Sequence, residues 1–389
     1  MKRFETNAIR TQVERSQHRE HAVPLYLTSS YVFNDAEQAR ALFAEEEEGN
    51  IYSRFTNPNA AEFEEKVSLM EGAESAFSTA TGMAAVFASL APFLKTGDHV
   101  VSSSSVFGNT HKVMTEVLPQ WGITCTYADI RDYSSWEKAI TKNTRILFIE
   151  TPSNPALDII DLKQLADLAH AHQALLVVDN CFATPYLQQP ISLGADMTLH
   201  SGTKYFDGQG RVMGGVIAGK KKDIKTIKNF IKRTGASISP FNAWVLSKSL
   251  ETLAVRMDRH CSNALRLAEY LQDHQAIESV TYPFLPSYPK YDLAKKQMKQ
   301  GGGLVCFEIT GGVERGRKFL DALQMISLTA NLGDTRSIAT HPASTTHSKL
   351  TAQERAKVYI PDGMIRISAG LEHIEDIIED IEQALSRSK

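Results

Sequence analysis

The chain has 389 residues, enough to bury two cores, and its formal net charge is only -3. It therefore lacks the basic field of a nucleic-acid-binding or membrane-surface protein, and we expect neither a nucleic acid nor a membrane as partner. No apolar run is long enough to span a membrane, no apolar signal segment opens the chain, and the four cysteines form no Cys-x-x-Cys pair; this predicts a cytoplasmic protein without a metal site.

The first 50 residues are predicted to form an N-terminal arm, because they are polar apart from one β-prone piece at Leu25–Phe33. The acidic run Glu45–Glu48 is interpreted as a solvent-exposed loop. The loop Gly49–Pro58 follows and places Tyr52 and Arg54 two positions apart. Such a pair can bind an anion, but the spacing alone is equally compatible with an ordinary surface.

From about residue 60 to residue 240 the chain alternates between helical and strand patterns. This alternation predicts an α/β domain over 51–240 with a mostly parallel sheet covered by helices on both faces. The expected helices are Ala61–Met70, one that opens at Ala80–Met83 and runs to about Leu90, and Leu162–His172; the expected strands are His99–Ser102, Arg145–Glu150, Ala174–Val178, Met197–Leu199 and Val212–Ala218.

A second, smaller α/β domain is predicted over residues 241–389, after the hinge-like Ser239-Pro240 pair. Its expected elements are a long helix Asn242–Gln272, the strands Leu304–Ile309 and Met364–Ser368, and a closing helix His373–Leu385.

Chemically capable side chains follow four of the predicted strands: Phe107, Asn154, Asp179 and the run Ser201–Lys204. Taken alone, Asp179 is most often a helix N-cap and Lys204 a solvated loop lysine. All four, however, follow a predicted strand, and strand-end loops at one sheet edge converge on one ligand site. We therefore interpret these residues as candidates for one shared site.

The residues suit a ligand that carries an aldehyde, a ring nitrogen and a phosphate, which is the description of pyridoxal 5′-phosphate (PLP). A desolvated lysine forms a Schiff base with an aldehyde, a carboxylate holds a protonated ring nitrogen, an aromatic ring stacks, and free amides at a helix start bind phosphate. The assignments are Lys204 for the aldehyde, Asp179 for the ring nitrogen, Phe107 for stacking, Gly82, Met83, Ser201 and Thr203 for the phosphate, and Arg366 for a substrate carboxylate. An arginine between two isoleucines, as at 366, is also compatible with a snorkelling edge residue.

Six ordered motifs resemble the Cys/Met-metabolism family of PLP enzymes, of fold type I, over essentially the whole chain. They are Tyr52-Ser53-Arg54, Ala80-Thr81-Gly82-Met83, Glu150-Thr151-Pro152-Ser153-Asn154-Pro155, Val178-Asp179-Asn180, Ser201-Gly202-Thr203-Lys204-Tyr205 and His341-Pro342-Ala343-Ser344. The resemblance implies a seven-stranded sheet in the large domain, a Schiff base on Lys204, and a hydrogen bond from Asn154 to the ring hydroxyl of PLP. It also implies that Tyr52 and Arg54 reach the phosphate in a neighbouring subunit, so that dimers sharing active sites assemble into a homotetramer.

Two stretches resemble the O-succinylhomoserine sulfhydrylase branch of that family: Ser105–Gly108 and Asn331–Asp334. Phe107 stands where many members carry tyrosine, and Asn109 where the γ-lyases acting on methionine carry cysteine. A phenylalanine stacks but donates no proton; this suits a carboxylate leaving group, whose acid has a pKa of about 4, better than a thiolate, whose acid has one of about 8.5.

The resemblance thus implies γ-replacement on O-succinylhomoserine or O-acetylhomoserine by sulfide, giving homocysteine for methionine biosynthesis. Asn331 and Arg366 are the predicted substrate contacts, and Lys112 is either a contact to the succinyl carboxylate or a solvated helix lysine. The alternatives are cystathionine γ-synthase, a methionine or cystathionine γ-lyase, a PLP-binding regulatory protein without turnover, and a cofactor-free Schiff-base aldolase.

Overall fold

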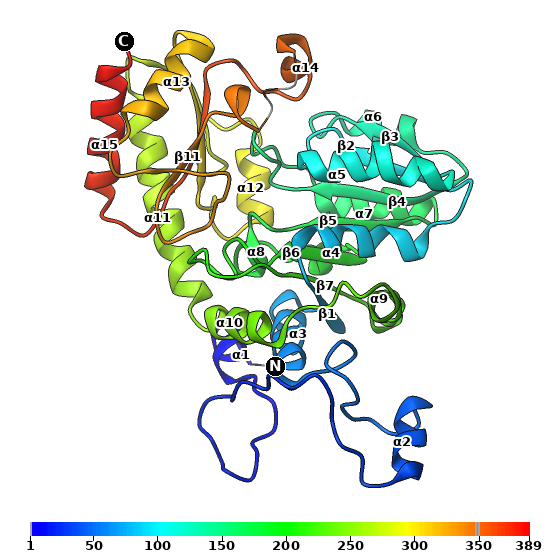
Figure 1. The fold of residues 1–389 in the computed structure, drawn as a ribbon. Helices are drawn as coiled ribbons and strands as arrows, with labels where there is room; N and C mark the ends of the chain where they lie inside the picture. Colours follow the sequence, from blue (N-terminus) through cyan, green and yellow to red (C-terminus); the bar gives the residue numbers. More distant parts are fainter. Residues whose placement is uncertain (1, 347, 349–350) are drawn as a thin grey trace.

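The computed structural model describes residues 2–346, 348 and 351–389 and contains two sheets. The larger sheet is drawn from residues 75–219 and the smaller from residues 277–368 (Figure 1). The predicted domain boundaries near residues 50 and 240 are compatible with this division and stay predictions.

The larger sheet has seven strands and is mostly parallel, as predicted; β7 alone runs antiparallel, to both of its neighbours. In spatial order the strands are β1 (Ser75–Thr79), β7 (Gly215–Gly219), β6 (Met197–Ser201), β5 (Leu175–Asp179), β4 (Thr144–Glu150), β2 (His99–Ser103) and β3 (Thr124–Ala128).

Helices cover both faces of this sheet, because its central strands are apolar on both sides. In β4, Leu147 and Ile149 pack against α6 (Tyr133–Ala139) and α7 (Leu162–Ala171), whereas Ile146 and Phe148 pack in the opposite cluster with α4 (Gly82–Leu90) and α9 (Lys221–Thr234). The helices outside the second sheet are α1 (Phe4–Arg10), α2 (Ala36–Phe43), α3 (Pro58–Glu71), α4 (Gly82–Leu90), α5 (Gly108–Lys112), α6 (Tyr133–Ala139), α7 (Leu162–Ala171), α8 (Thr184–Leu187), α9 (Lys221–Thr234) and α10 (Pro240–Leu250).

The smaller sheet has five strands in the order β10 (Ser327–Leu328), β11 (Ile338–Thr340), β12 (Met364–Ser368), β9 (Leu304–Ile309) and β8 (Ile277–Thr281). Its core joins β9 and β12 to the long helix α11 and the closing helix α15. The helices of this part are α11 (Leu253–Gln272), α12 (Tyr291–Gln297), α13 (Gly312–Ala322), α14 (Ala352–Lys357) and α15 (Ile374–Arg387).

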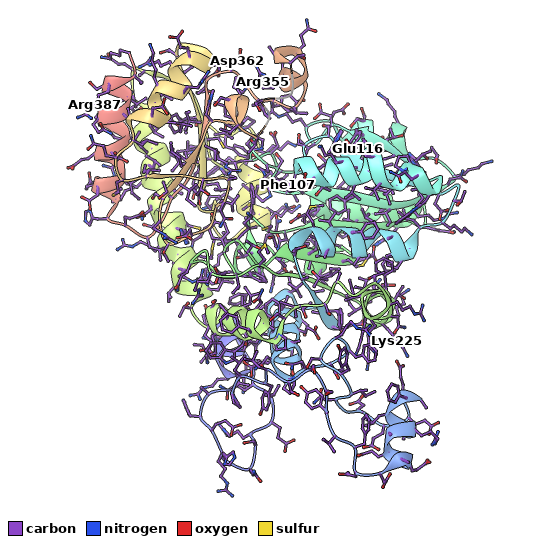
Figure 2. All side chains as sticks on the ribbon, viewed as in Figure 1. Phe107, Glu116, Lys225, Arg355, Asp362 and Arg387 are labelled. Carbon is purple, nitrogen blue, oxygen red and sulfur yellow. The ribbon has the colours of Figure 1, made fainter. Side chains whose placement is uncertain are left out.

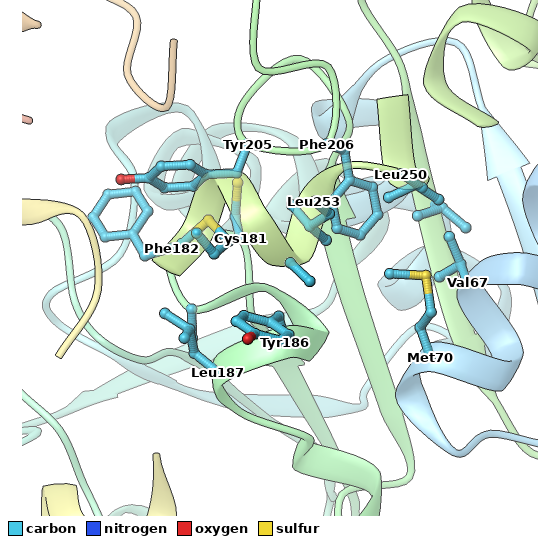
Figure 3. Close-up of a cluster of buried hydrophobic side chains, with 14 of the residues drawn as sticks. Val67, Met70, Cys181, Phe182, Tyr186, Leu187, Tyr205, Phe206, Leu250 and Leu253 are labelled. Atoms are coloured by element: carbon cyan, nitrogen blue, oxygen red, sulfur yellow. The ribbon is translucent and has the colours of Figure 1, made fainter. Parts of the chain in front are cut away.

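A fourth cluster of buried side chains includes residues of the two segments that follow β5 and β6 (Figure 3). Cys181 and Phe182, just after β5, share this cluster with Tyr205 and Phe206, which directly follow Lys204. Both segments are therefore held by the same core, which fixes the strand ends on which Asp179 and Lys204 lie.

The prediction of one continuous helix over Asn242–Gln272 is wrong, because the segment forms two helices: α10 ends at Leu250 and α11 begins at Leu253. The carbonyl of Ser249 accepts hydrogen bonds from the Arg256 guanidinium at 2.9 Å and the Thr252 hydroxyl at 3.1 Å. The Thr252 N–H also donates to this carbonyl at 3.2 Å, from one residue nearer than in a continuous α-helix, and these three contacts together accompany the break. The predicted strand Val212–Ala218 likewise begins only at Gly215.

The segment that contains α2 forms an arm that extends away from both sheets, with α2 near its far end (Figure 1), whereas α1 packs against α3 and buries Ala8. The β-prone piece Leu25–Phe33 forms no strand there; it contributes one isolated bridge, between Ser30 and Tyr52. Leu27 and Val32 are largely exposed, since the arm has no neighbouring strand to cover them. Within the described residues, no helix combines the length and the apolar character needed to cross a bilayer.

Candidate active site

A cavity of about 440 Å³ opens at the carboxyl ends of the central strands, where the strand-end loops were expected to converge. Its lining residues come from both sheets and from the start of α4. It includes nine of the residues that were predicted to bind the cofactor or substrate: Gly82, Met83, Phe107, Asn154, Asp179, Ser201, Thr203, Lys204 and Arg366.

Lys204 lies in the turn after β6, where the Gly202 N–H donates to the Gly214 carbonyl at 2.8 Å. Its Nζ donates a hydrogen bond to Asn331 Oδ1 at 2.6 Å. Burial lowers the pKa of Lys204 below its usual range, and the nearby positive charge of Arg366 also lowers it. A lysine whose neutral form is favoured in this way is a competent amine nucleophile.

Asp179 is the last residue of β5, and its Oδ1 accepts the Cys181 N–H at 3.1 Å. Burial raises the pKa of Asp179 to about 6, against a weaker lowering by the Cys181 N–H and by His200. The carboxyl group is thus tied to its own loop and faces the cavity that Lys204 also lines.

The start of α4 forms an anion site beside the Lys204 loop. Thr81 caps the helix by accepting the Ala84 N–H at 3.1 Å, and amides in the first turn of a helix have no intrahelical acceptor. Gly82 allows a close approach to the loop, because a Cβ there would lie 2.6 Å from Ser201 Cβ and 2.8 Å from Ser201 Oγ. The amides of residues 82 and 83 and the Ser201 hydroxyl therefore face one small volume.

Arg366 reaches the cavity from β12 of the other sheet and is only 4% exposed. Its Nη1 donates to Asn154 Oδ1 at 2.7 Å, and its buried Nε has no hydrogen-bond partner within the described residues. A buried guanidinium nitrogen without an acceptor is costly, so this geometry points to a carboxylate ligand that supplies one.

Phe107 lies at the boundary between the parts of the molecule built on the two sheets (Figure 2). Its side chain is 43% exposed, and its main-chain N–H donates to Glu150 Oε2 at 2.7 Å. Glu150 opens the motif Glu150–Pro155, but no role was predicted for it. The cavity also contains Leu332 from the stretch Asn331–Asp334, and Ala330 and Thr346, which no sequence pattern singled out.

Other predicted site residues lie outside this cavity. Arg54 lines a separate cavity of about 100 Å³ and stacks its guanidinium 4.7 Å from the ring centre of Phe55 and 5.5 Å from that of Tyr52. Lys112 is exposed on α5, whereas Asn331 contacts the site through Lys204. The roles that the resemblance implies for Tyr52, Arg54, Lys112 and Asn331 stay predictions.

The residues present fit PLP and an α-amino acid. The cavity combines an amine of lowered pKa, a carboxyl group, a helix-start anion site, an aromatic side chain and a buried guanidinium nitrogen that lacks an acceptor. Each matches one group of the cofactor or of its substrate, and together they would hold the aldehyde, the ring nitrogen, the phosphate and the substrate carboxylate.

Comparisons with known proteins agree with this fit. A family model described as Cys/Met metabolism PLP-dependent enzyme matches residues 5–386. The chain is 46% identical to the O-succinylhomoserine sulfhydrylase of Pseudomonas aeruginosa over 98% of its length and 95% of that protein. It is 44% identical to an L-methionine γ-lyase of Porphyromonas gingivalis, over 94% and 92% of the two chains.

A solved structure of a putative O-acetylhomoserine (thiol)-lyase from Campylobacter jejuni superposes with a TM-score of 0.95 at 35% identity, covering 99% of this chain and 100% of that one. Its description records a pyridoxyl-lysine monophosphate, which is PLP joined to a lysine. The chain therefore belongs to the Cys/Met metabolism family of PLP-dependent enzymes, with pyridoxal 5′-phosphate as its cofactor and an amino acid as its substrate.

Proposed function

We propose that this enzyme replaces the succinyloxy group on Cγ of O-succinyl-L-homoserine with sulfide, releasing homocysteine and succinate for methionine biosynthesis. The observation that carries this choice within the family is Phe107, an aromatic side chain without an acidic proton at the cavity. The identity to a sulfhydrylase over nearly the whole chain supports it. The four cysteines are free, which fits a reducing compartment, and we place the enzyme in the cytoplasm.

Bound in this cavity, PLP would supply an electron sink for the carbon atoms next to the substrate nitrogen. Arg366 holds the α-carboxylate through its unpaired Nε, so that the substrate Cα lies near Lys204. Lys204 then moves protons at the substrate Cα and Cβ, for which its lowered pKa makes the neutral amine available. Asp179 keeps the proton on the ring nitrogen.

The side chain at position 107 is compatible with the departure of a carboxylate leaving group. Succinate departs from Cγ as a carboxylate that needs no proton, so a stacking ring without a hydroxyl is sufficient at position 107. Sulfide then adds at Cγ, so the bond lost is carbon–oxygen and the bond gained carbon–sulfur.

The specific alternative is γ-lyase activity, which the methionine γ-lyase relative supports. Asn109, which lines the cavity where those lyases are expected to carry cysteine, argues against it. The test is a panel of O-succinylhomoserine and O-acetylhomoserine, each with sulfide or cysteine, and methionine alone. We expect the highest kcat/KM with O-succinylhomoserine and sulfide; faster release of ammonia and an oxoacid from methionine would contradict the proposal.

We also propose that two chains share their active sites in dimers that pair into a homotetramer. Tyr52 and Arg54 lie in the segment between α2 and α3, and neither is among the residues that line the main cavity in the described part of their own chain. Arg54 also donates to the Lys232 carbonyl, which keeps its guanidinium on the surface of the large sheet's helices. From that position it is available to a phosphate held in a second chain.

A further inference from the structure

Besides Asp179, the cavity contains a second acidic side chain, Glu150, which has no role in the proposed reaction. Glu150 is only 4% exposed, although it is the last residue of β4. A buried carboxyl group at a strand end is costly unless a partner compensates it, so its contacts indicate what it does.

Strand register determines where the Glu150 side chain lies. Parallel strands β4 and β5 pair with Glu150 opposite Asp179, so the two side chains project from the same face of the sheet. Both line the cavity. Glu150 is therefore placed beside the residue expected to hold the ring nitrogen.

The partner of Glu150 is the main chain of Phe107, whose N–H donates to Oε2 at 2.7 Å. Phe107 occupies the N-cap position of α5, which has only five residues and no side-chain cap. The Phe107 carbonyl accepts the His111 N–H at 3.0 Å, which holds it within its own short helix. The bond to Glu150 instead ties this helix start to the edge of the sheet, next to Asp179.

We propose that Glu150 is a positioning residue that holds Phe107 against the face of the cofactor ring by accepting its main-chain N–H. The proposal rests on the proposed function in placing PLP between Phe107 and the sheet. It requires an acceptor oxygen at position 150 and no negative charge.

The electrostatics fit a neutral acceptor. Burial raises the pKa of Glu150 well above its usual range, and the neighbouring Asp179 carboxylate raises it further. A protonated carboxyl group keeps a carbonyl oxygen that accepts the Phe107 N–H. Asp179 is then left as the charged member of the pair beside the ring nitrogen.

The test compares Glu150→Gln with Glu150→Met in the holoenzyme. Both replacements have nearly the size of glutamate, but only glutamine keeps an acceptor oxygen. Hydrogen–deuterium exchange of the peptide spanning residues 104–110, and the visible circular dichroism of bound PLP, report on Phe107 without any substrate. We expect Glu150→Met to speed exchange at Phe107 by about tenfold or more and to change the dichroism, because a buried hydrogen bond is lost. Glu150→Gln is expected to keep both signals near those of the unmodified enzyme.

A double-mutant cycle shows whether Glu150 acts through Phe107. Phe107→Ala and Glu150→Met are each expected to lower kcat/KM, and the double variant is expected to lose no more than Phe107→Ala alone. Additive losses would overturn the proposal, as would equal dichroism changes in the Gln and Met variants. If the Met variant does not fold, rapid exchange of the Phe107 amide in the unmodified holoenzyme is sufficient to overturn it. A wrong substrate assignment would leave the exchange and dichroism results intact, so the two failures are distinguishable.

Discussion

The close approach of α4 to the Lys204 loop makes Gly82→Ala a sharp test of the anion site. A Cβ at residue 82 would lie 2.6 Å from Ser201 Cβ and 3.0 Å from Ser201 Cα. Non-bonded carbon atoms rest at about 3.5–4.0 Å, so the helix start and the loop must separate by about 1 Å. Separation of this kind moves the amides of residues 82 and 83 away from the Ser201 hydroxyl.

Overpacking of a close contact costs about 1–3 kcal/mol, and we expect most of it to appear as lost cofactor affinity. The Kd of PLP should therefore rise roughly 5- to 150-fold. The measurement is a titration of apoenzyme with PLP, followed by absorbance. Gly108→Ala is the matched control, because Gly108 lines the same cavity but an added Cβ has no atom within 4 Å.

A variant of Ser201 tests whether the close contact between residues 82 and 201 causes the loss of PLP affinity. Ser201→Gly removes the Cβ and Oγ that the new methyl group meets, so it should recover part of the affinity lost in Gly82→Ala although it weakens binding by itself. Gly82→Ala with unchanged affinity, or losses that simply add in the double variant, would refute the close-contact argument.

Four further predictions concern the reacting groups and the shared site. Lys204→Ala should lower kcat by at least roughly 100-fold, measured as homocysteine release, because proton transfer is lost. Arg366→Lys should raise KM roughly 10- to 100-fold with a smaller change in kcat, since lysine cannot bind a carboxylate bidentately. In the apoprotein, the pKa of Asp179 is raised from 3.8 to about 6, so the folded state binds that proton more tightly than the unfolded state does. This contribution to stability is lost as the pH rises from about 4 to about 6. The Tm of Asp179→Asn should therefore fall less over that pH range than the Tm of the unmodified protein. Mixing inactive Arg54→Ala and Lys204→Ala chains should restore about a quarter of the activity if dimers exchange subunits randomly, and no recovery would exclude shared sites.

The central part of the fold could be predicted because its signals are local. The apolar runs of β4, β5 and β6 predicted strands, and polar residues at their ends predicted a common crevice. The edge strand β3 was missed, because its alternating exposed and half-buried residues, TCTYA, form no apolar run. The break after Leu250 was missed because it depends on Arg256 and Thr252 bonding to one carbonyl, which periodicity does not encode.

The residues that line the site could be predicted from the sequence, but the contacts between them could not. Asp179 and Lys204 could be paired because both follow strands of one sheet. The contact from Lys204 to Asn331, however, joins residues 127 positions apart in the chain, and that from Arg366 to Asn154 joins residues 212 apart. Glu150 was overlooked for a different reason: its partner is a main-chain N–H, and any residue type at position 107 other than proline would provide one.

Arg366 belongs to the smaller sheet, whereas Asp179 ends a strand of the larger one and Lys204 lies in the turn after the next strand. On the proposed assignment, the residue that binds the substrate carboxylate and the residues that hold PLP therefore come from different sheets, and the Arg366–Asn154 hydrogen bond joins the two.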